Sequence, residues 1–299
     1  MALTVLRDEA GARLPEALAT SIQPCAAFEL AESDEAEVLG FLAERPVHTV
    51  FMASVIRDNG LVSPITRGTF YGFRDHDSRL QGVALIGHAT LVEARTETAL
   101  TAFARIAQRC TSARLIRGER DMVHRFWNQY ASVHLQPRLV CSELMLEQRT
   151  PFLLRESVTG LRQACPEDLP HVAAVNCEMA IKEDGTNPLE RDPQGFIERT
   201  TRRIEQGRVW IWVRDGKLTF KADIVADTPE AVYLEGVYVN QDERGKGHGL
   251  RCLTQLGWIL LARTDSICLT VSQRSDSAAN FYYKAGYRLS SYYETIYLQ

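Results

Sequence analysis

One stretch of the chain indicates its fold: Val237-Tyr238-Val239-Asn240-Gln241-Asp242-Glu243-Arg244-Gly245-Lys246-Gly247-His248-Gly249-Leu250. It begins as a strand in which apolar residues alternate, and a polar turn leads into three closely spaced glycines. An amphipathic helix is predicted next, because leucines recur at helical spacing: Leu250, Leu253, Leu256, Leu260 and Leu261.

A strand that passes through glycines into a helix N-terminus can hold a phosphate group. Glycines let the main chain approach an anion closely. The first free N–H groups of the helix then point at the anion, aided by the helix dipole. Arg244 and Lys246 add positive charge at the same place. The stretch therefore predicts an anion-binding loop, with a glycine-rich loop that binds nothing as the alternative.

The spacing of the glycines separates this loop from two common phosphate-binding motifs. A P-loop needs Ser or Thr after its lysine, whereas Gly247 follows Lys246, and glycines at 245, 247 and 249 do not fit G-x-G-x-x-G. The loop fits R-x-x-G-x-G and resembles the acyl-CoA pyrophosphate loop of the GCN5-related N-acetyltransferase (GNAT) superfamily. The resemblance implies that acetyl-CoA, as cosubstrate, is held by Arg244, Gly245, Lys246, Gly247, His248 and Gly249.

A second motif lies about 35 residues further along the chain. Phe281-Tyr282-Tyr283-Lys284-Ala285-Gly286-Tyr287 resembles the F-Y-E-K-L-G-F helix end of the same family. The spacing to the glycine selects Tyr282 as the residue that protonates the leaving thiolate. The family's cofactor-contacting Asn falls on Ser275, which is a departure from the pattern. An aromatic helix end that only packs in the core is the alternative for Tyr282.

The order of predicted elements occurs twice along the chain. The first half predicts helices over 33–44, beginning with a Ser33 cap, and over 47–56, then a hairpin over 70–86, a helix over 96–110, a strand at 115–116, a helix over 121–130 and a strand over 139–146. After a break at 148–151 the order returns, with helices over 168–181 and 193–206, a hairpin over 208–226, strands over 231–239 and 267–271, a helix over 277–285 and a final strand region over 287–298.

We interpret this order as an α/β fold of two tandem GNAT-like domains, each a mixed sheet flanked by helices. Residues 1–150 form a degenerate domain without the pyrophosphate loop, because the passage from Val92 to Thr98 has no glycine. Residues 151–299 form the acetyl-CoA-binding domain. A chain of 299 residues fits two domains of about 150 residues each.

Composition excludes several other classes. A formal net charge of −4 offers no field that attracts nucleic acid, so no nucleic-acid partner is expected. Seven scattered cysteines without a C-x-x-C pair indicate reduced thiols. No apolar run is long enough to cross a bilayer, and Met1 to Ala19 has no apolar core of signal-peptide length, so we expect a cytoplasmic protein without a membrane partner. No metal site is predicted, because five histidines share no ligand spacing: His48, His76, His88, His124 and His134.

The resemblance implies direct attack of a primary amine on the thioester. The pantetheine arm would pair with the open edge of the fourth strand, here Val237, Tyr238 and Val239, and an N–H at 237 or 238 would polarise the carbonyl. A protonated amine cannot attack, so a base or a water chain must remove its proton. Glu235 is the candidate base, and on a regular strand it shares a face with Val237 and Val239. A solvated or ion-paired carboxylate is the alternative.

The acceptor is expected to be a small-molecule or peptide amine. The loop over residues 182–192 is acidic and would attract a cationic amine, or is only a solvated loop. The stretch Phe220-Lys221-Ala222-Asp223 resembles a group of two-domain bacterial acetyltransferases and implies no particular substrate. The predicted activity is N-acetyl transfer, and the alternative is an acyl-CoA-binding regulatory module without turnover. The sequence leaves undecided whether the chain forms a homodimer.

Overall fold

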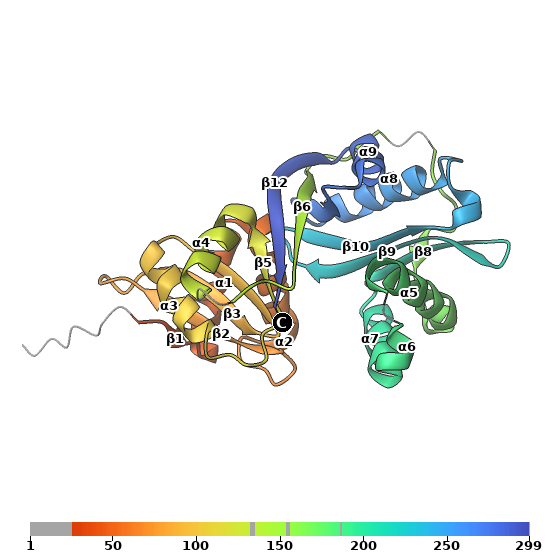
Figure 1. The fold of residues 1–299 in the computed structure, drawn as a ribbon. Helices are drawn as coiled ribbons and strands as arrows, with labels where there is room; N and C mark the ends of the chain where they lie inside the picture. The colour runs from red at the N-terminus through yellow and green to blue at the C-terminus, as the bar shows by residue number, and fades with distance from the viewer. Residues whose placement is uncertain (1–25, 132–134, 154–155, 186, 299) are drawn as a thin grey trace, which may run out of the picture.

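The computed structural model describes residues 26–131, 135–153, 156–185 and 187–298. The predictions for Met1 to Ala19 and for His134 lie outside these ranges. Within them the strands form one twelve-stranded sheet in the order β1-β2-β3-β4-β5-β12-β6-β11-β10-β9-β8-β7. Figure 1 shows two lobes joined by the central strands β6 and β12.

The predicted elements of the first half occur in the predicted order, and the structure adds two strands that were not predicted, Phe28–Glu29 and Ala89–Ala94. They are β1 (Phe28–Glu29), a 3-10 turn η1 (Glu32–Asp34), α1 (Glu35–Ala43), α2 (Pro46–Asn59), β2 (Gly68–Arg74), β3 (Leu80–Gly87), β4 (Ala89–Ala94), α3 (Glu97–Ala107), β5 (Leu115–Glu119), α4 (Arg120–Tyr130) and β6 (Leu139–Gln148). The predicted Ser33 cap is wrong. The 3-10 turn contains Ser33, and the carboxylate of Asp34 accepts the Ala31 N–H at 2.9 Å instead.

The second half repeats this order. It comprises β7 (Arg162–Gln163), η2 (Pro166–Asp168), α5 (Leu169–Asp184), α6 (Pro188–Arg191), α7 (Pro193–Glu205), β8 (Val209–Arg214), β9 (Lys217–Asp227), β10 (Val232–Val239), η3 (Gln241–Glu243), α8 (His248–Leu261), β11 (Ile267–Ser272), α9 (Asp276–Lys284) and β12 (Arg288–Tyr297). The loop predicted over 182–192 is partly helical. Pro188 starts α6, and the Asn187 side chain caps it by accepting the Leu189 N–H at 3.0 Å.

The last strand of each half extends into the other half. β6 pairs with β11 and β12 of the second half, and β12 pairs with β5 of the first half. The sheet is therefore continuous across residue 150, and the boundary placed there from sequence stays a prediction.

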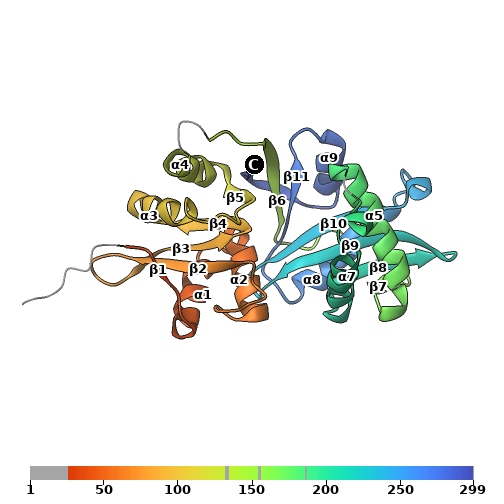
Figure 2. The same ribbon diagram turned by 60° about the horizontal axis from the view of Figure 1, so that its bottom comes forward.

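Helices cover both faces of the second-half sheet. Figures 1 and 2 show α8 and α9 on one face of β8–β10 and α5 and α7 on the other. The predicted stripe of α8 packs inward, since Leu253, Leu256 and Leu260 are buried against the sheet. The opposite core joins Val172 and Val175 of α5 to the sheet. In the part of the chain that the structure describes, no helix is both long and apolar enough to cross a bilayer.

Candidate functional site

β10 and β11 separate partway along their length. Their parallel pairing covers only Val232↔Ile267 and Tyr233↔Cys268. Beyond Tyr233, β10 no longer pairs with β11, so one edge of β10 is open. Its opposite edge stays paired with β9 as far as Val239. An extended ligand can pair with such an open edge as an added strand would.

A β-bulge interrupts β10 beside this separation. The register with β9 shifts between Glu235↔Asp223 and Tyr238↔Lys221, so that Gly236 and Val237 face a single residue. Gly236 has φ +58°, a conformation that glycine adopts without strain. The prediction that Glu235 shares a face with Val237 and Val239 is wrong, because the extra residue breaks the alternation of the strand.

A groove of about 710 Å³ lies between β10, the glycine loop, α8 and α9. This volume falls within the range of small-molecule sites. The groove brings together eight residues that the sequence selected: Val237, Val239, Arg244, Gly245, Gly247, His248, Gly249 and Tyr282. Sequence reasoning missed Asn280 and Lys284, which line the groove from α9. Asn280 and Lys284 follow Ser277 by three and seven residues, which places all three on one face of a helix, and this spacing could have identified them.

The glycine loop leaves its main chain open toward this groove. Gly245 and Gly247 have φ +76° and +79°, and no atom lies within 4 Å of the position that a Cβ would take on either residue. No side chain caps α8 at Gly247. Among the described residues, no acceptor takes the backbone N–H groups of residues 245–250. These unpaired donors at a helix N-terminus fit an anion.

Gly249 serves a different purpose in the loop. A Cβ at this position would lie 2.5 Å from Cγ2 of Val239. The absence of a side chain therefore lets the first turn of α8 pack directly on β10.

Charged side chains surround the glycine loop. The Arg244 Nε–H donates to the Val239 carbonyl at 3.1 Å, and Lys246 Nζ lies 3.0 Å from Glu243 Oε1. Burial lowers the pKa of His248, and the nearby guanidinium of Arg251 lowers it further. His248 is therefore neutral at pH 7, and Nδ1 accepts from Arg251 at 2.7 Å.

Four of the selected residues lie elsewhere. Tyr238 packs in the core beneath α5, and Lys246 projects from the loop into solvent. Ser275 occupies the N-cap position of α9, where its N–H donates to the Ser272 carbonyl at 2.9 Å. Glu235 faces a second pocket on the other side of β10.

This second pocket has a volume of about 240 Å³. It lies between α5, α7 and the strands β9 and β10, and is lined by Asn176, Met179, Ala180, Phe196, Arg199, Thr200, Arg203, Asp223, Glu235 and Gly236. Glu235 is exposed, and its side chain forms no hydrogen bond or ion pair with any described residue. The β10 bulge therefore contributes to both sites. Glu235 and Gly236 line the floor of the second pocket, and Val237 lines the wall of the groove.

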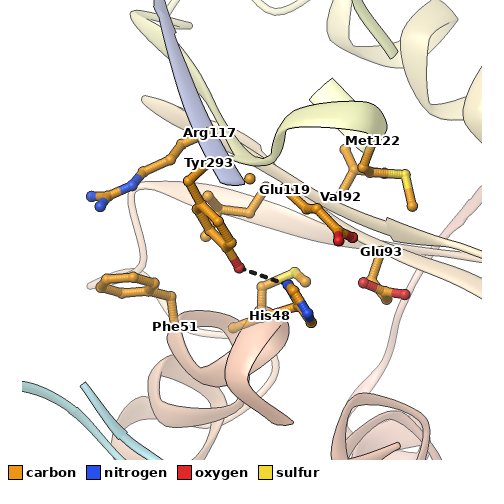
Figure 3. A pocket seen from close by; sticks show the side chains of 11 residues that line it. His48, Phe51, Val92, Glu93, Arg117, Glu119, Met122 and Tyr293 are labelled. Atoms are coloured by element: carbon orange, nitrogen blue, oxygen red, sulfur yellow. Dashed lines mark hydrogen bonds between the residues drawn. The ribbon is translucent and has the colours of Figure 1, made fainter. Parts of the chain in front are cut away.

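The first half has the same strand separation but fills it differently. β4 and β5 pair only at Ala89↔Leu115 and Thr90↔Ile116. Figure 3 shows the space beyond them, where Glu93 and Glu119 lie near the His48–Tyr293 hydrogen bond of 3.1 Å.

An ion-pair network links charged side chains in this region. Arg45 bridges both carboxylates, at 3.0 Å to Glu93 and 2.5 Å to Glu119. At the start of α3, the Thr96 side chain accepts the Ala99 N–H, so a side chain already caps this helix.

Of three comparisons with known proteins, only the one with solved structures found similar chains. No family model matches the sequence, and no curated protein matches it. A GNAT-family acetyltransferase from Colwellia psychrerythraea is similar in structure, with 13% identity, 91% of this chain and 99% of that chain covered, and a TM-score of 0.58.

Two further structures cover the chain as widely. A GCN5-related N-acetyltransferase from Sphaerobacter thermophilus has 14% identity, covers 91% of this chain and 95% of its own, and has a TM-score of 0.57. A tandem GNAT protein from the clavulanic acid biosynthesis pathway has 11% identity, with 91% and 98% covered and a TM-score of 0.57. The element order, the repeated strand separation and these likenesses together show that the chain has the tandem GNAT fold.

Proposed function

We propose that the chain is an N-acetyltransferase that moves the acetyl group of acetyl-CoA to a primary amine. The observation that carries the proposal is the glycine loop, whose N–H groups over residues 245–250 have no acceptor in the described chain. A pyrophosphate is the ligand that would use several such donors at once. The arginine and lysine of the loop would add charge at its rim.

The open edge of β10 would hold the pantetheine arm. Beyond Tyr233 this edge is free of β11, and Val237 and Val239 line the groove next to it. A backbone N–H at the bulge would donate to the thioester carbonyl oxygen and stabilise the negative charge that develops there. Because the donor is fixed by the strand, it needs no rearrangement during the reaction.

The acceptor amine would enter from the second pocket, across β10 from the groove. Glu235 is the base that we propose, because its carboxylate forms no hydrogen bond or ion pair with a described residue and its strand borders the separation of β10 and β11. It takes a proton from the ammonium group, directly or through water. The amine nitrogen then bonds to the carbonyl carbon, and the bond from that carbon to sulfur breaks.

Tyr282 is the group that we propose to protonate the departing thiolate. It lines the groove from α9, and its ring contacts Phe281 and Tyr287 edge-on at centroid distances of 5.2 and 5.8 Å. These two contacts support the ring from α9 and from the start of the last strand region. A phenol held beside the sulfur gives its proton to the thiolate, and the second proton of the amine nitrogen, which leaves as the amide forms, returns through water to the phenolate.

The first half would not bind a second acetyl-CoA. Its strand separation is occupied by Glu93, Glu119 and Arg45, and Thr96 caps the helix that would otherwise offer free N–H groups. We propose that this half supports the second through the shared strands β6 and β12. The partner of the enzyme is then a small-molecule or peptide amine, and the protein would act in the cytoplasm.

The proposal is tested by ligand binding followed by turnover. Acetyl-CoA at a hundred times its dissociation constant should stabilise the protein by about 2.7 kcal/mol, seen as a rise in melting temperature. A panel of amines should then release CoA thiol in the presence of acetyl-CoA. An unchanged melting curve at millimolar acetyl-CoA would refute the proposal, and binding without turnover on any amine would favour a regulatory acyl-CoA-binding module.

A further inference from the structure

An ion-pair cluster lies beneath the bulge of β10, within the stretch 220–223. Lys221 is fully buried, and its Nζ lies 2.8 Å from Oδ1 of Asp223, which is also buried. Arg203 of α7 approaches the other oxygen of this carboxylate at 3.2 Å. Two cations thus meet one anion, and the cluster has a formal charge of +1.

The ammonium group of this cluster is incompletely satisfied. Its contact with Asp223 is not aligned as a hydrogen bond, so Lys221 Nζ is a buried donor with no hydrogen-bond partner among the described residues. It lies directly below the bulge, because a Cβ on Gly236 would stand 3.0 Å from Nζ. Gly236 lines the second pocket, so this positive charge lies just beneath the pocket floor. Because the cluster carries a net positive charge, a counter-anion nearby would stabilise it.

The wall of the second pocket carries further positive charge. Arg199 and Arg203 are four residues apart on α7 and lie on the same helix face, toward the pocket. Arg199 pairs with Asp192 at 3.0 Å, and both side chains are about half exposed. An exposed pair of this kind contributes little and can exchange its partner for a ligand.

The carboxylate of Glu235, which forms no ion pair within the described part of the chain, lies on β10, across the pocket from α7. The pocket is therefore bipolar, with one carboxylate beside the strand separation and an excess of cations on the floor and the helical wall. A zwitterionic ligand would match both ends, with its ammonium group near the reacting carbonyl.

We propose that the acceptor is an amine that also carries an anionic group, a carboxylate or a phosphate. This inference rests on the proposed function and names the substrate class of the same site. Arg199 and Arg203 hold the anionic group above the positive floor, and Glu235 receives the ammonium. The volume of about 240 Å³ suits a ligand portion of amino-acid size.

The test compares matched acceptors in a thiol-release assay with the full-length protein. One arm uses L-amino acids against their primary amides, which keep the shape and remove the negative charge. The other arm uses amino-sugar phosphates against the free amino sugars. The anionic member of at least one set of pairs should have a kcat/KM at least tenfold higher, and the arm that shows this preference identifies the group as carboxylate or phosphate.

Variants then assign the preference to the pocket wall. Arg199→Gln should raise KM for the preferred anionic acceptor about 10- to 150-fold, the loss of one charged hydrogen bond, and leave the KM for its neutral counterpart unchanged. Arg202→Gln is the matched control, because Arg202 is exposed and does not line the pocket. The KM for acetyl-CoA should not change in either variant.

Three results would overturn the inference. They are equal use of the anionic and neutral members in both arms, a preference for the neutral member in both arms, or an equal rise in KM for both members in Arg199→Gln. Each of these still requires turnover and leaves the proposed function intact. Failure of acetyl-CoA to bind at all would instead remove the proposed function and this inference with it.

Discussion

Replacing Gly247 by alanine should separate the anion-binding role of the loop from its structural role. Gly247 is left-handed, with φ +79° and ψ −3°, and nothing lies within 4 Å of the position of a new Cβ. The methyl group would meet no protein atom, so the folding cost is only that of the left-handed backbone, about 1–2 kcal/mol. The methyl group would stand in the space that we assign to the pyrophosphate.

The expected loss of binding follows from the donors that would be displaced. A hydrogen bond to a charged oxygen contributes about 1.5–3 kcal/mol, so displacing one donor weakens acetyl-CoA binding about 10- to 150-fold. Isothermal titration calorimetry measures this ratio directly. Gly185→Ala is the matched control, because Gly185 ends α5 with φ +73° and ψ 7° and also has no neighbour within 4 Å.

Both variants should lose similar stability, while only Gly247→Ala should lose affinity for acetyl-CoA. Binding by Gly247→Ala within twofold of the wild type would refute the assignment of the loop. So would an equal loss of affinity in Gly185→Ala, because the effect would then come from reduced stability.

Four further outcomes are expected. Tyr282→Phe should cut turnover about 10²–10⁴-fold with acetyl-CoA affinity unchanged, whereas Tyr283→Phe, outside the groove, should be nearly silent in the same assay. Asp223→Leu should lower the free energy of unfolding by about 3–5 kcal/mol in denaturant titrations, because it leaves Lys221 buried without its partner, and adding Lys221→Met should recover most of the loss. Burial lowers the pKa of His48, so the unfolded chain binds the proton more readily than the folded chain does. The contribution of His48 to stability is therefore lost as the pH falls below about 6.5. The difference in unfolding free energy between wild type and His48→Gln should narrow from pH 8 to pH 5, and a constant difference would contradict this. Calorimetry should give one acetyl-CoA per chain, and a value of two would show that the first half also binds.

The sequence by itself determined the features that neighbouring residues specify. The glycine loop and the leucines on the buried face of α8 lie within one stretch of the chain. Their spacing was therefore sufficient to predict a strand, an open loop and a helix in that order. The repeat was also predictable, because the hydrophobic periods of each half give the same succession of helices and strands. Tyr282 was found in the groove because its helix end has a local pattern of its own.

Only the tertiary structure decided which side of β10 each residue faces and which strands are neighbours. The bulge at Gly236 arises from the register with β9, and one extra residue leaves no mark in the local alternation, so the face of Glu235 was predicted wrongly. The cluster of Lys221, Asp223 and Arg203 depends on how α7 packs against the sheet. The exchange of β6 and β12 joins segments about 150 residues apart in the sequence. It could not be predicted, because the alternation of apolar residues shows which face of a strand is buried but not which strand lies beside it.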